Sequence, residues 1–214
     1  MYLSTIRLVL GETGEALDAI QTGFGLQGQS SDPKFEMFLC ARLAQAHLQQ
    51  GGAGALQRAE PALERGMRLA DKPSSTLVSA LASAALASAA VDLWEARGRP
   101  AAERQPLAQF LKQSIRNARG DWRPGTLPLL WRLRGWEAWL FGKPARARRA
   151  WRKSLAVAER LKIPYEAGLA HSVLGQHAAA GLYRQAHLQQ AAEIFERLGA
   201  AYDLEQARQA FEAG

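Results

Sequence analysis

The stretch that decides the fold is residues 126–163, TLPLLWRLRGWEAWLFGKPARARRAWRKSLAVAERLKI. Two runs of apolar or small residues in it recur at spacings of three and four, which places each run on one face of a helix. The first run is Trp131, Gly135 and Ala138, and the second is Ala147, Trp151, Ser154 and Ala158. Gly142 and Pro144 separate the runs, so we predict two antiparallel helices joined by a tight turn.

The ends and the interior of this hairpin have residues suited to their places. Thr126 is a residue type that caps helices, and Pro128 would fall in the first helical turn, where a missing N–H costs little. The small Gly135 allows the two helices to approach each other closely. We therefore predict that Trp131 and Trp151 fill the core beside it.

The pattern of the hairpin recurs along the whole chain. Candidate turn glycines stand at positions 11, 51, 98, 142 and 175, at spacings of 40, 47, 44 and 33 residues. Periods of this length are typical of stacked helical hairpins. We predict one domain over residues 1–214, with hairpins at 1–31, 32–73, 74–120, 126–163 and 164–199 and a capping helix at 201–212.

The composition agrees with an all-α fold. The chain has 214 residues, of which 48% are hydrophobic, and its Val, Ile, Tyr and Phe content is low beside Ala, Leu and Arg. The single cysteine excludes a disulfide framework and any site built from several cysteines. Cys40 lies in an apolar segment with Phe38 and Leu39, so we expect a buried, unreactive thiol.

The hairpin resembles the tetratricopeptide repeat family. The residues that carry the resemblance are Trp131, Gly135, Gly142, Pro144, Ala147, Trp151 and Ser154. The segments at 160–166 (RLKIPYE) and 196–202 (ERLGAAY) are also similar to the C-terminal repeats of large bacterial signalling ATPases, which are linked to cyclase or Ser/Thr kinase domains. The resemblance implies a right-handed superhelical solenoid with a concave groove. It also implies a non-catalytic scaffold that binds a peptide or partner helix, as a regulatory part of a longer signalling protein.

In this family the first helix of each hairpin lines the groove. Carried over to this chain, the resemblance places in the groove Leu129, Arg132, Trp136, Trp139, Leu140, Tyr165, Leu169 and Ser172. Arg132 could bind a carboxylate of the partner while an exposed Trp136 ring covers an apolar side chain. The alternative is that Trp136 or Trp139 packs against a neighbouring hairpin.

Positive charge is concentrated in residues 112–162, which contain 14 Lys and Arg, three acidic residues and five of the six tryptophans. Its centre is the segment with Lys143, Arg146, Arg148, Arg149, Arg152 and Lys153. Such a face can attract nucleic acid or another polyanion, because the release of condensed counterions drives that binding. This is the alternative function. The other interpretation is that these residues form the solvated face of one helix.

No pattern in the sequence assembles a catalytic or cofactor site. The segment at 23–28, GFGLQG, has the spacing of a dinucleotide fingerprint but no strand before it, and GGAG at 51–54 lacks the lysine of a phosphate loop. The histidines at 47, 171, 177 and 187 show no metal-binding spacing. We expect no enzyme activity, no cofactor and no metal.

The expected location is the cytoplasm, with no membrane segment. The longest uncharged stretch, residues 73–91, is rich in Ala and Ser, which favour a buried helix over a membrane span. Solenoids also associate through their end hairpins, so a homo-oligomer is a further possibility.

Overall fold

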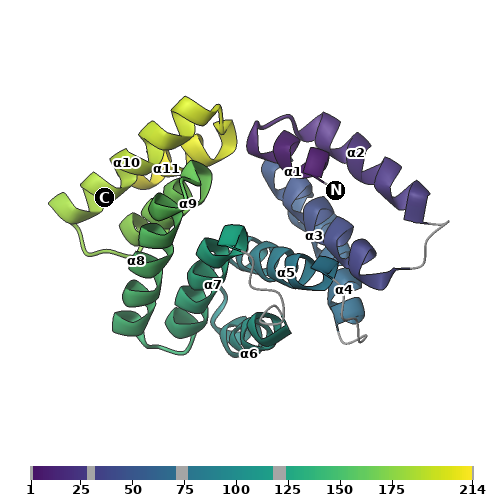
Figure 1. Ribbon diagram of the computed structural model, residues 1–214, viewed down its shortest axis with the longest axis horizontal. Coiled ribbons are helices and arrows are strands. Elements are labelled where there is room, and N and C mark those ends of the chain that lie inside the picture. The colour runs from purple at the N-terminus through teal and green to yellow at the C-terminus, as the bar shows by residue number, and fades with distance from the viewer. Residues whose placement is uncertain (1, 28–31, 71–76, 118–123, 214) are drawn as a thin grey trace. The chain divides into compact units, whose positions relative to one another are not determined.

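The computed structural model describes residues 2–27, 32–70, 77–117 and 124–213. These residues form helices and turns, and no β-strand occurs among them, so the predicted all-α fold is confirmed for this part of the chain (Figure 1). The chain divides into two compact units. Unit 1 comprises Met1–Leu8 and Glu12–Trp122, and unit 2 comprises Val9–Gly11 and Arg123–Gly214.

Unit 1 is built around helix α3, which packs against α2, α4 and α5. Its helices are α1 (Tyr2–Val9, of which Val9 belongs to unit 2), α2 (Thr13–Gln27), α3 (Pro33–Gln50), α4 (Ala55–Ala70), α5 (Leu77–Ala96) and α6 (Ala101–Asn117). Residues 23–27 of the glycine-rich segment lie in α2, and Gly28 falls outside the described residues. A helix at that position confirms that the segment does not follow a strand.

The ends of α3 and α4 are joined by one buried lysine. Asp32 caps α3 by accepting a hydrogen bond from the backbone N–H of Lys34 at 2.9 Å. The Lys34 ammonium then donates to the last carbonyls of α4, those of Leu69 (3.3 Å) and Ala70 (2.9 Å). A cation at a helix C-terminus both satisfies carbonyls and complements the helix dipole.

Cys40 lies in the core of unit 1 with no exposed surface. Burial raises the pKa of its thiol to about 11, against an ordinary value of 9.0. The prediction that Cys40 is buried is confirmed, and the raised pKa disfavours the nucleophilic thiolate at neutral pH.

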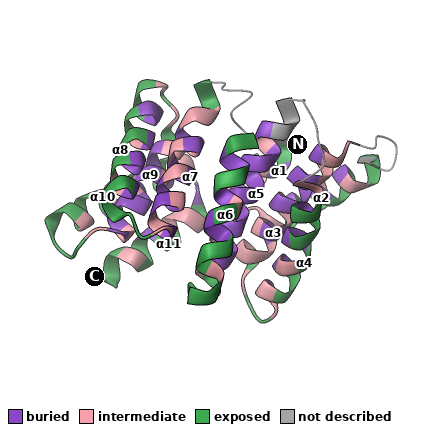
Figure 2. Cartoon of the chain, turned by 90° about the horizontal axis from the view of Figure 1, so that it is seen from below, coloured by how far each residue is buried: buried purple, intermediate pink, exposed green. Residues whose placement is uncertain are grey.

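Unit 2 consists of a short 3-10 turn and five helices, each of which packs against the next (Figure 1). They are η2 (Pro124–Thr126), α7 (Leu127–Leu140), α8 (Pro144–Arg160), α9 (Pro164–Gln176), α10 (Leu182–Leu198) and α11 (Ala201–Glu212). Helix α9 also contacts both α7 and α11. Contacts between neighbours and next neighbours are the arrangement expected of stacked helical hairpins. Figure 2 shows the buried residues of α7, α8 and α9 on the sides that face one another.

Three turns of unit 2 share one geometry. Gly142, Lys162 and Gly199 have φ values of 72°, 55° and 68°, and in each turn the next N–H donates to the carbonyl five residues back. This is the Schellman ending of a helix, which needs a left-handed residue and therefore favours glycine. Two of the turns repeat in sequence as well, since residues 159–166 (ERLKIPYE) correspond to 196–203 (ERLGAAYD). Lys162 thus occupies a position that is glycine in the next repeat.

One local prediction in unit 2 is confirmed in part, and another is wrong. Thr126 is the N-cap residue of α7, as predicted, but its side chain makes no capping hydrogen bond. Gly175 is not a turn glycine and lies inside α9, where a Cβ would stand 2.6 Å from Cγ of Leu188. Gly175 is therefore a point of close approach between α9 and α10, and the chain turns near Gly181 instead.

Candidate functional site

The α7–α8 hairpin holds most of the residues that the sequence singled out, and Trp151 lies in its interior. This side chain is fully buried, and its indole N–H donates to the backbone carbonyl of Arg132 at 3.1 Å. Ser154, one turn later on α8, donates to the carbonyl of Pro128 at 2.7 Å. Both carbonyls belong to α7, so two side chains of α8 fix the register of the hairpin. The prediction that Trp151 belongs to the core is confirmed.

Trp136 is buried rather than exposed in a groove. Only 3% of its surface is accessible, and it lies edge-on to Trp151 (5.7 Å between ring centroids) and His177 (4.9 Å). Trp139 contacts the same two rings, at 6.0 Å and 4.5 Å. These four rings from α7, α8 and the end of α9 form an aromatic cluster. The structure agrees with the second interpretation of the sequence, in which Trp136 packs against neighbouring helices and does not face a groove.

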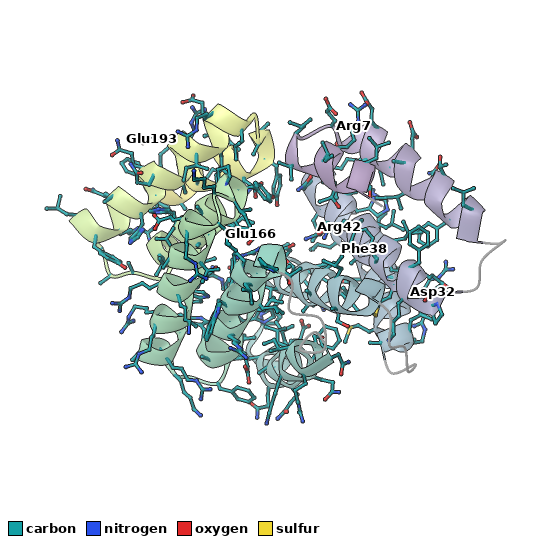
Figure 3. All side chains as sticks on the ribbon, viewed as in Figure 1. Arg7, Asp32, Phe38, Arg42, Glu166 and Glu193 are labelled. Carbon is teal, nitrogen blue, oxygen red and sulfur yellow. The ribbon has the colours of Figure 1, made fainter. Side chains whose placement is uncertain are left out.

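Arg132 already has a carboxylate partner within unit 2. Its guanidinium lies 3.3 Å from Glu166 of α9, and the two side chains are only 10% and 16% exposed. Figure 3 shows Glu166 on the part of α9 that lies beside α7. Arg132 was predicted to bind a carboxylate of a partner. In the structure the carboxylate that it binds belongs to Glu166 of the same chain.

A second polar contact joins α9 to α11. The Tyr165 hydroxyl donates to Asp203 at 2.9 Å, and burial together with the neighbouring Asp203 charge holds the pKa of the phenol well above its usual value of 10.0. Tyr165 and Glu166 thus connect α9 to the helices on both sides of it. The pair has a structural role in unit 2.

The remaining predicted groove residues differ in accessibility. Leu140 and Ser172 are buried, and the Ser172 hydroxyl accepts a hydrogen bond from Gln176 at 3.2 Å. The side chains that keep part of their surface exposed are Leu129, Trp139, Tyr165 and Leu169. A binding surface on α7 and α9 would therefore consist of these four residues. Arg132 and Trp136, which were expected to anchor a ligand, are buried and do not belong to it.

The basic residues of α8 and of the turn before it, in contrast, lie mostly on the surface. Lys143, Arg146, Arg149, Arg152 and Lys153 are exposed, and nitrogen-tipped side chains project from this helix in Figure 3. Residues 143–162 contain eight Lys and Arg and only one acidic residue, Glu159. Within the described part of the chain, none of the cations between 143 and 153 forms an ion pair with a carboxylate. We call Lys143, Arg146, Arg148, Arg149, Arg152 and Lys153 the basic face.

Trp131 belongs to the edge of the basic face and not to the core. The prediction that it fills the hairpin interior is wrong, because its side chain is partly exposed. The Lys153 ammonium lies 4.0 Å from the centre of its ring, and the Arg134 guanidinium carbon lies 4.5 Å from it. Both distances are those of cation–π contacts.

A histidine pair that the sequence did not predict lies between α9 and α10. His171 and His187 approach to 2.8 Å between their Nδ1 atoms, and Tyr183 lies edge-on to His187. Burial and the neighbouring imidazole lower the pKa of His171 to about 4, from an ordinary value of 6.5. Burial and the nearby Arg152 charge also lower the pKa of His187. The two residues are 16 positions apart on different helices, so no local spacing indicates the pair.

A group of metal ligands and a membrane-spanning helix are both absent from the described residues. Nowhere among them do three or more His, Cys, Asp or Glu side chains come together as metal ligands would. In the same residues, every helix falls short of the length and apolarity that crossing a bilayer requires.

Comparisons with protein-family models and with curated protein sequences gave no match.

Proposed function

We propose that this chain is a non-catalytic binding module of helical hairpins, and that its basic face binds a polyanion. The observation that carries the proposal is the exposure of five of the six cations of the basic face, together with their lack of carboxylate partners among the described residues. Proteins usually intersperse surface charges of both signs. A cluster of one sign is favourable when an anionic partner neutralises it and counterions are released.

The charge of the whole chain supports the same function. The net charge is +7 and the isoelectric point is about 10.0, so a polyanion is attracted at neutral pH before any specific contact forms. Trp151 and Ser154 hold α8 in register on α7 through hydrogen bonds to its backbone. The backbone positions of the cations are therefore set before binding, and only their side chains lose conformational entropy.

The test adds the protein to a fluorescently labelled DNA duplex at several salt concentrations and measures binding by fluorescence anisotropy. For the wild-type chain we expect affinity to fall steeply as salt rises. Arg148→Glu with Arg152→Glu should weaken binding at least tenfold and reduce the slope of log K against log salt by about two, because two phosphate contacts are lost. The matched control is Lys112→Glu with Arg116→Glu, two exposed cations of α6 at the same spacing. An equal loss in the control would assign binding to net charge and not to the basic face.

Peptide capture on α7 and α9 is the second candidate function. It is supported by the partial exposure of Leu129, Trp139, Tyr165 and Leu169 on adjacent helices, and by the resemblance of the hairpins to tetratricopeptide repeats. Trp136→Ala does not test it, because Trp136 is part of the aromatic cluster. Leu129→Arg is the better variant. A protein retained from a nuclease-treated lysate by the wild type, lost with Leu129→Arg and kept with the double α8 variant would support peptide capture.

A regulatory role in a larger bacterial signalling protein is part of this second candidate. It rests on the two segments that are similar to the repeats of signalling ATPases. Both segments form the same turn, at the α8–α9 and α10–α11 junctions. Repeats that share sequence and turn geometry favour an array over an irregular helical domain.

A further inference from the structure

Trp131 is the one tryptophan of α7 that lies outside the aromatic cluster. Trp136 and Trp139 contact Trp151 and His177, whereas the Trp131 ring contacts the cations of Lys153 and Arg134. A hydrophobic ring that is partly exposed and bordered by two cations contributes less to the core than a buried one. Trp131 is therefore available for contacts with a ligand at the surface.

The ring is continuous with the basic face. Arg146, Arg149 and Lys153 follow one another at spacings of three and four, so they form one stripe along α8, and Lys153 lies over Trp131 at the end of that stripe. The stripe rises by about 10 Å from Arg146 to Lys153, at about 1.5 Å per residue. A row of cations that ends at an aromatic ring combines two kinds of contact on one surface.

We propose that the basic face and Trp131 bind single-stranded nucleic acid, with one base stacked on the Trp131 ring. This inference rests on the proposed function and specifies its polyanion. A base takes the place of the Lys153 ammonium over the ring, and the ammonium moves to a phosphate, as its flexible four-carbon stem allows. Stacking needs an unpaired base with an accessible face, which a single strand offers and a duplex does not.

Other polyanions would use the cations of this surface but not its aromatic ring. A polyphosphate or a sulfated polysaccharide carries charge but no ring to stack, and an acidic peptide offers carboxylates without a row of planar bases. Single-stranded binding proteins combine a basic track with aromatic rings and tolerate any sequence, since every base has a π-face. The ring at the end of the basic stripe thus favours a single strand.

The experiment compares three labelled probes of equal length, about 16 nucleotides, which is the upper size of a single-domain binding site. The probes are oligothymidine, an abasic deoxyribose-phosphate strand and a DNA duplex, and binding is followed by anisotropy at low and moderate salt. We expect the wild type to bind oligothymidine about tenfold more tightly than the abasic strand, because the stacked base adds to the phosphate contacts. Equal affinity for these two probes would overturn the inference, and that comparison needs no variant.

Variants then locate the stacked base. Trp131→Leu should remove the tenfold preference for oligothymidine and leave binding of the abasic strand unchanged, whereas Trp131→Phe should keep part of it. Phe211→Leu on α11 is the control, since Phe211 is an exposed aromatic residue of the same unit away from α8. A preference that survives Trp131→Leu would show that the ring is not the stacking site. If none of the three probes binds the wild type, the proposed polyanion function fails together with the inference.

Discussion

Trp151 lies directly against the backbone of Gly135, so closely that a Cβ atom at Gly135 would overlap the indole nitrogen. The indole N–H reaches the carbonyl of Arg132, in the turn before Gly135. Gly135 therefore sets the distance between α7 and α8, and Trp151 sets their register. The basic face is carried on the other side of α8, so its position depends on this contact.

Gly135→Ala should lower the free energy of unfolding by about 3 kcal/mol, because Trp151 must move and lose its hydrogen bond. Thermal unfolding followed by circular dichroism measures the effect. The control is Gly25→Ala in α2, where a Cβ meets nothing within 4 Å and the change should be neutral or stabilising by up to about 1 kcal/mol. Equal melting temperatures for Gly135→Ala and the wild type would contradict the close contact.

Lys162 has a left-handed backbone, with φ of 55°, at a position where the next repeat has Gly199. Lys162→Gly should stabilise the chain by about 0.5 kcal/mol, since the strain of the side chain exceeds the entropy cost of glycine. Gly142→Ala supplies the reverse experiment. Its Cβ would meet nothing within 4 Å, so the expected loss of about 1 kcal/mol is purely conformational. Denaturant titrations of both variants check the prediction, and a loss of stability with Lys162→Gly would refute it.

The helical hairpin could be predicted from the sequence because its signals are local. The turn needs one left-handed residue and a helix start, which Gly142 and Pro144 provide, and the stripe around Trp151 has helical spacing. The stripe on α7 was less informative. This helix packs against both α8 and α9, so it is buried around most of its circumference. A single apolar stripe therefore could not tell that Trp136 is buried and Trp131 partly exposed.

The partners of the candidate residues could not be predicted, because each comes from a distant helix. Arg132 and Glu166 are separated by 34 positions, and His171 and His187 by 16. The charge of α8 was visible in the sequence, whereas the exposure of its cations and their lack of carboxylate partners depend on which helices surround α8. The basic face was thus predictable in composition, and its accessibility required the packed structure.

The Arg132–Glu166 ion pair should behave as a buried pair, because both side chains are almost fully enclosed. Arg132→Met and Glu166→Leu should each cost about 3 kcal/mol, since each leaves one charge without its partner. The double variant Arg132→Met with Glu166→Leu should recover most of that loss. A double-mutant cycle in urea gives the coupling energy. Additive effects of the two substitutions would mean that the charges do not interact.

The His171–His187 pair should make stability depend on pH below neutrality. The pKa of folded His171 is about 4, below its ordinary value of 6.5, so the unfolded chain takes up the proton first. The contribution of His171 is therefore fully present above pH 6.5 and is lost as pH falls from 6.5 to 4. Because the ring is half-buried, we expect the free energy of unfolding to fall by about 1 kcal/mol over this pH range. His171→Gln should abolish that decrease. Melting temperatures of both proteins between pH 7 and pH 4 measure the difference. Parallel curves for the wild type and His171→Gln would show that protonation of this pair is not coupled to folding.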